Sequence, residues 1–184
     1  MTEARRVSSE PTTPFAMRGT AYHEAGHAVA FLARGREIEL VRLEEDATGE
    51  VVPVDSYSLN ELSYGRADGS IPCRELETEI IVSYAGPAAE ARLLGIEITP
   101  EGMIVPEGFE SYSFGHRTDF QHVQDFAARE PTWRKPLQHK ARLLRSAKWV
   151  TKRHWGAVEA IAMELLRERQ VSGSRCRELF DSTG

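Results

Sequence analysis

The chain has 184 residues, a formal net charge of −5 and 41% apolar residues, a composition that favours one soluble domain with a hydrophobic core. The acidic balance argues against general nucleic-acid binding, and the two cysteines, Cys73 and Cys176, lie too far apart to indicate a disulfide framework or a thiolate zinc site. The sequence shows no secretory signal and no run of the ~18 apolar residues that a membrane span needs, so we expect a cytoplasmic protein.

The first residues are polar, and we predict a disordered N-terminal arm over 1–18 and a single domain over 19–184. A helix is expected from about Gly19 to Arg34, because apolar residues recur there with helical spacing and Gly35 is a natural stop. The apolar stripe consists of Tyr22, Ala25, Gly26, Val29, Leu32 and Ala33. Small residues in and beside the stripe leave room for another element or a substrate to approach closely.

This first helix carries the pattern H-E-x-x-H at His23, Glu24 and His27, on the flank of the stripe. Residues four apart share one helix face, so both imidazoles can reach one metal ion. A catalytic zinc uses three protein ligands and a water molecule. The zinc lowers the pKa of this water, so that it can lose a proton and act as a nucleophile near neutral pH. A carboxylate beside that water, here Glu24, can take its proton and later give it to a leaving amine. The motif therefore predicts a zinc site with the chemistry of peptide hydrolysis.

Two short strands are predicted after this helix. Residues 38–43 alternate between apolar and charged side chains, and residues 51–54 form a second strand beyond a turn. Pro53 has no N–H to donate to a ladder, so the second strand should lie at the edge of the sheet. Residues 55–69 are expected to form a loop with a short helical piece near 59–62.

The remaining elements are predicted to be helical. A second helix should end at Leu94 and be kinked or broken at Gly86-Pro87, and residues 96–116 should form a long surface loop. Thr118 is expected to cap a third helix, with Gln121 in the reciprocal capping position.

The C-terminal part is predicted to be helical over 136–170, with a break near 154–156, and again from Ser172 or Ser174 to Phe180. Elements that read as helix thus outnumber those that read as strand. The predicted fold class is mainly α with a small β-sheet (α+β).

The third zinc ligand is not decided by the motif alone. Ala30 and Ala33 stand where an extended H-E-x-x-H-x-x-G-x-x-H site would need Gly and His, which excludes that arrangement. An acidic or imidazole side chain further along must complete the site. The candidates are Glu44, Glu45 and Glu50 in the strand–turn–strand region, and Asp119, His116 and His122 around the start of the third helix.

Four segments resemble FtsH-type zinc metalloproteases. They are the zinc motif at 22–29, the segment 84–90 with Gly86 and Glu90, the segment 118–123 with Thr118 and Asp119, and the helical end at 158–180. The resemblance implies a zincin-like helical peptidase domain with a small sheet. It also implies zinc on His23, His27 and Asp119, with Glu24 as the catalytic base.

We expect neither the AAA+ module nor the transmembrane anchor of that family, and the sequence contains no phosphate-binding loop motif. We therefore expect ATP-independent cleavage of peptides or unfolded proteins. An unfoldase or adaptor partner could present these substrates, and the chain could also form an oligomer. Residues 134–153 hold eight Lys or Arg and no acidic residue, and are a candidate docking segment. The alternative is a zinc-containing binding or regulatory protein of the same fold that does not cleave and docks a partner or nucleic acid there.

Overall fold

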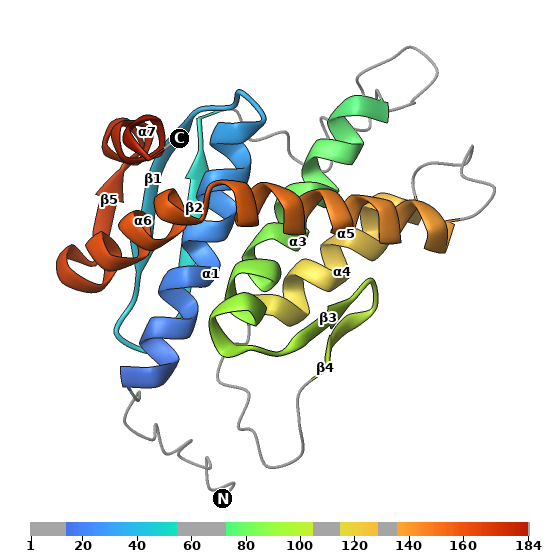
Figure 1. Ribbon diagram of the computed structural model, residues 1–184, viewed down its shortest axis with the longest axis horizontal. Helices are drawn as coiled ribbons and strands as arrows, with labels where there is room; N and C mark the ends of the chain where they lie inside the picture. Colours follow the sequence, from blue (N-terminus) through green and yellow to red (C-terminus); the bar gives the residue numbers. More distant parts are fainter. Residues whose placement is uncertain (1–13, 55–72, 105–114, 129–135, 184) are drawn as a thin grey trace, which may run out of the picture.

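The computed structural model describes residues 14–54, 73–104, 115–128 and 136–183. Within these ranges, six helices pack with a three-stranded antiparallel sheet and a separate two-stranded hairpin, which confirms the predicted mainly α class with a small sheet. No described helix is both long enough and apolar enough to cross a membrane. The described parts of the chain are shown in Figure 1.

Helix α1 (Pro14–Ala33) is the centre of the fold and lies between the sheet and helix α3 (Figure 1). Nearly all of its residues from Ala16 to Leu32 are buried, on every face of the helix. The predicted one-sided stripe was therefore wrong: a helix without a polar face is a core helix, and His23, Glu24 and His27 lie inside the protein.

The start of α1 also differs from the prediction. The helix begins at Pro14 rather than near Gly19, so residues 14–18 belong to the helix and not to a disordered arm. Proline is tolerated there because the first turn of a helix leaves its N–H groups unpaired anyway. The rest of the predicted arm lies outside the described residues.

The sheet has the strand order β2-β1-β5, with β1 (Ile38–Leu43) at its centre and both neighbours antiparallel to it. Strand β2 (Gly49–Pro53) is at one edge of the described sheet, as Pro53 predicted. Strand β5 (Gln170–Ser172) was not expected, because three residues are too few to show alternation. Its Val171 pairs with Val41, which brings the C-terminal part of the chain back to the start.

Helix α3 (Cys73–Leu94) runs without interruption through Pro87, so the predicted break at Gly86-Pro87 does not occur. Packing against α1 buries the residues on both sides of this proline and holds the helix together. The expected loop at 96–116 instead begins with a hairpin of β3 (Glu97–Thr99) and β4 (Gly102–Ile104). The predicted loop at 55–69, with its helical piece, and residues 105–114 lie outside the described residues.

Helix α4 (Gly115–Ala128) starts three residues before Thr118, so the predicted cap at that threonine was wrong. The Gln121 amide instead donates to the Asp125 carboxylate one turn along the helix. The chain continues in α5 (Pro136–Arg153), α6 (Trp155–Glu168) and α7 (Gly173–Ser182). The predicted break near 154–156 is confirmed. Of the two serines predicted to begin the last helix, Ser172 is the one that caps it, since its hydroxyl accepts from the backbone N–H of Arg175 at the start of α7.

Helices α1 and α3 approach each other closely in the core. A Cβ atom at Gly26 would lie 2.5 Å from the carbonyl oxygen of Ala85 and 2.7 Å from the Cβ of Ala89. Only a glycine on α1 and small side chains on α3 allow the two backbones to come this near. The small residues noted in the sequence therefore make room for another helix.

Replacing Gly26 with alanine should destabilise the fold, because the added methyl group meets backbone atoms that cannot turn away. Overpacking of this kind costs about 1–3 kcal/mol in the free energy of unfolding. Urea denaturation should show this loss for Gly26→Ala. Gly102→Ala, where the new Cβ meets no atom within 4 Å, should stay near wild type. Equal midpoints for the two variants would contradict the close contact.

Candidate metal centre

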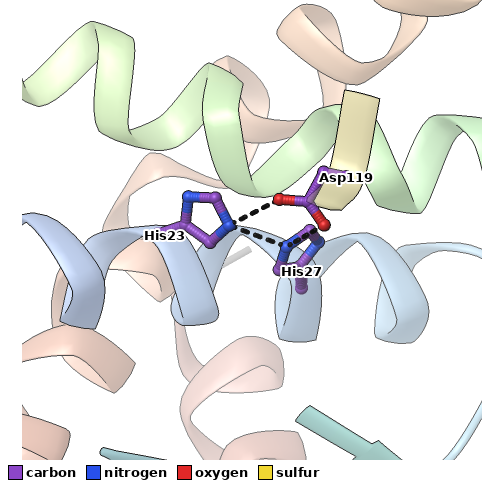
Figure 2. A group of neighbouring side chains, drawn as sticks. All are labelled: His23, His27 and Asp119. Atoms are coloured by element: carbon purple, nitrogen blue, oxygen red, sulfur yellow. Dashed lines mark hydrogen bonds and ion pairs between the residues drawn. The ribbon is translucent and has the colours of Figure 1, made fainter. Parts of the chain in front are cut away.

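Three side chains from two helices meet at one point. His23 and His27 come from successive turns of α1, and Asp119 comes from the N-terminal part of α4 (Figure 2). The Nε2 atom of His23 lies 2.8 Å from Asp119 Oδ2 and 3.0 Å from His27 Nε2, and His27 Nε2 lies 3.4 Å from Asp119 Oδ1. The three residues form a group that can hold a metal ion.

The other nitrogen of each imidazole has a fixed partner. His23 Nδ1 lies 3.0 Å from the carboxylate of Glu90, and His27 Nδ1 lies 2.8 Å from the backbone carbonyl of Val82. Carboxylate and carbonyl oxygens only accept, so each Nδ1 must donate and each Nε2 of a neutral ring carries the lone pair. Partners of this kind orient histidine ligands in metal sites.

This tautomer assignment directs two lone pairs at each other across 3.0 Å, with the Asp119 carboxylate beside them. Acceptors at this separation repel unless a proton or a metal cation lies between them. Metal–nitrogen and metal–oxygen bonds of ~2.0–2.1 Å in a tetrahedral zinc site put ligand atoms about 3.3 Å apart. The observed separations of 2.8–3.4 Å therefore fit such an ion after shifts of a few tenths of an ångström.

The electrostatics of the site also favour a positive charge. Burial alone would lower the pKa of His23, but Asp119 and Glu90 outweigh it and raise that pKa well above its usual value. The pKa of His27 is also raised, because Asp119 again outweighs burial. Burial tends to raise the pKa of Asp119, yet the two imidazoles bring it below its ordinary value. The Asp119 carboxylate is thus stabilised by positive charge close to it. A bound cation would supply that positive charge.

Packing between α3 and α4 places Asp119. Phe120, Val123 and Phe126 lie on the buried face of α4, and the Phe120 ring meets the Tyr84 ring of α3 edge-on at 5.8 Å. Asp119 precedes this apolar face by one residue, so its carboxylate is carried to the two histidines when α4 packs. The ligand position therefore depends on tertiary contacts of its neighbours.

Glu24 lies beside the ligands in a cavity of about 600 Å³ that also contains His23, His27 and Asp119. Its side chain is buried, and burial raises its pKa. Gly49 of β2 lies directly against it, since a Cβ there would be 2.6 Å from Glu24 Cγ. Strand β2 thus borders the cavity and restrains the carboxylate.

The other predicted ligand candidates are not part of this group. Glu44 and Glu45 are exposed in the turn after β1. Glu50 reaches the cavity rim but pairs with Arg42 on the neighbouring strand, and His122 lines the cavity one turn beyond Asp119. The side chain of His116 lies outside the described part of the structure.

One functional residue was left without a role by sequence reasoning. Glu90 is 4% exposed and bonds to His23 across 67 residues of sequence. A glutamate among alanines in an otherwise buried helix was the available signal, because a carboxylate in such a place needs a partner. The chain does not name that partner, so only the packing of α3 on α1 reveals it.

The class that fold and site define is a mainly helical α+β protein with a buried His–His–Asp centre that can hold a metal ion. No protein-family model matches the chain, and no curated protein matches it. Its function is therefore inferred from its own residues.

Gly86 gives a direct test of the ligand geometry. A Cβ at this position would lie 2.3 Å from His27 Nε2, so Gly86→Ala should push the imidazole out of the group. We expect the affinity for a metal ion, with added zinc as the probe, to fall by at least about tenfold, the lower end of the losses seen when the supports of a ligand are changed. Competition with a chromophoric chelator measures this, with Gly102→Ala as the matched control. Unchanged affinity in Gly86→Ala would show that His27 does not bind through Nε2.

Proposed function

We propose that this protein is a zinc-dependent metallopeptidase, with a site that resembles that of FtsH-type enzymes. His23, His27 and Asp119 are the proposed zinc ligands, and Glu24 is the proposed catalytic acid–base group. The observation that carries the proposal is the convergence of three ligand atoms beside a buried carboxylate in one cavity. Zinc is favoured over harder ions because two of the three donors are imidazoles.

When bound, zinc supplies a Lewis acid that polarises the scissile carbonyl and acidifies a water molecule. The protein's own residues supply the rest. Glu24 lies in the same cavity as the ligands without being one, the position from which it can take a proton from water and give it to the leaving nitrogen. Gly49 keeps that carboxylate in place, and Glu90 and the Val82 carbonyl orient the imidazoles.

The proposed substrate is an extended peptide or an unfolded protein. Strand β2 borders the cavity through Gly49, Glu50 and Val51, and it is at one edge of the described sheet. A peptide that added to β2 as a further strand would pass its backbone along the cavity, a common mode of peptide recognition. No step of this reaction uses a nucleotide, so cleavage of such substrates is proposed to be independent of ATP.

The first prediction from this proposal concerns metal content. Purified protein should contain about one zinc per chain, as expected of a site with three protein ligands. Asp119→Ala should lose most of that zinc, because the two imidazoles alone form an incomplete site. Glu44→Ala and Glu50→Ala are the matched controls and should keep it, since neither carboxylate lies in the ligand group. Elemental analysis after gel filtration measures the ratio, and full occupancy in Asp119→Ala would overturn the ligand assignment.

The second prediction separates catalysis from metal binding. Glu24→Gln should keep its zinc, because the new amide has the same shape and the ligands are untouched. Hydrolysis of an unfolded protein should fall by roughly 10²–10⁴-fold, the contribution of a positioned acid–base group.

A chelator-treated wild-type sample provides the background rate for this comparison. Equal cleavage by wild type and Glu24→Gln would overturn the assigned role of Glu24. Zinc binding without cleavage by either protein would instead identify the non-cleaving regulatory alternative.

A further inference from the structure

Helix α5 has a cationic face that the proposed peptidase reaction does not use. Its exposed basic residues are Arg142, Arg145, Lys148, Lys152 and Arg153, and the helix contains no acidic residue. Trp149 lies among them and is 61% exposed. Tryptophan and arginine are both enriched at the surfaces through which proteins bind their partners.

This face borders a second cavity, of about 400 Å³, where α5 meets α1 and α3. Arg34, Arg142 and Arg145 line it together with Ser146 and the Trp149 indole. None of its lining residues belongs to the metal cavity. Helix α3 contributes to both, with Val82 facing the metal site and Ile81 facing the arginines. Helices α5 and α3 are in contact and cross each other (Figure 1).

The arginines around this cavity are only partly neutralised. Arg142 pairs with the carboxylate of Glu77, whereas Arg34 donates to the uncharged hydroxyl of Thr78. No ion pair joins Arg145 to another residue in the described ranges. Like charges placed around one cavity repel each other, so an anion bound among them would be stabilised.

We propose that this α5 surface docks a short acidic segment of a partner protein. Guanidinium groups bind carboxylates through paired hydrogen bonds, and an exposed tryptophan flanked by arginines has the composition of a binding hot spot. The helix from Arg142 to Arg153 spans about 17 Å at 1.5 Å per residue. That length matches about five residues of extended peptide.

The surroundings favour an acidic peptide over a nucleic acid. Glu77 on the N-terminal half of α3 lies beside the Arg142 end of the surface and pairs with Arg142 there. The phosphates of a longer strand would meet this carboxylate, and the whole chain carries a net charge of −5. A short acidic segment can end before it reaches Glu77.

The test is binding of a fluorescently labelled peptide with a run of glutamates beside one phenylalanine, measured by anisotropy. We expect saturable binding that weakens as salt rises, and no binding of the same peptide with glutamines in place of the glutamates. Arg145→Glu and Trp149→Ala should each weaken binding by about tenfold or more, as expected of hot-spot residues. Both side chains are exposed, so these variants should fold.

Arg167→Glu on α6 is the matched control and should bind as wild type, because this arginine is also exposed but lies outside the cavity. All variants should keep their zinc, and zinc content and peptide binding are measured separately from cleavage. Failure of the proposed peptidase activity would therefore leave this result standing. Equal binding of the glutamine peptide, no effect of either variant, or tighter binding of a single-stranded oligonucleotide through the same residues would each overturn the inference.

Discussion

The close packing of α1 on α3 is the constraint on which the rest of the structure depends. Gly26 allows the two backbones to approach until only a hydrogen fits between them, and Gly86 leaves the space that the imidazole of His27 occupies. At that separation the carbonyl of Val82 and the carboxylate of Glu90 reach the two Nδ1 atoms. Helix packing therefore orients both histidines.

That orientation has an electrostatic consequence. Both Nε2 atoms point at one place, and Asp119 adds a carboxylate from α4. Buried polar groups that face one another without a compensating partner are costly, so the site favours a cation. The same burial that makes the arrangement costly also lowers the local dielectric constant, which strengthens every charge interaction in the centre.

The two cavities divide the molecule into separate regions. The metal centre is built where α1, α3 and α4 meet, and β2 borders its cavity. The arginine cavity lies where α5 meets α1 and α3, and it shares no residue with the first. A partner on α5 would therefore leave the proposed peptide path along β2 uncovered. Helix α3 contributes residues to both cavities and so connects the proposed docking surface with the proposed peptidase site.

The local pattern by itself determined the histidine pair, its neighbouring glutamate, the edge strand with Pro53 and the helical class, since helix spacing and proline chemistry act over a few residues. Asp119 was one candidate among several by chemistry, and the FtsH resemblance alone favoured it. Tertiary structure decided that Glu50 pairs with Arg42, that Glu90 supports His23 and that α1 is buried on all sides. These outcomes depend on which distant segments pack together, because a carboxylate's partner is set by proximity in the fold and not by its position in the chain.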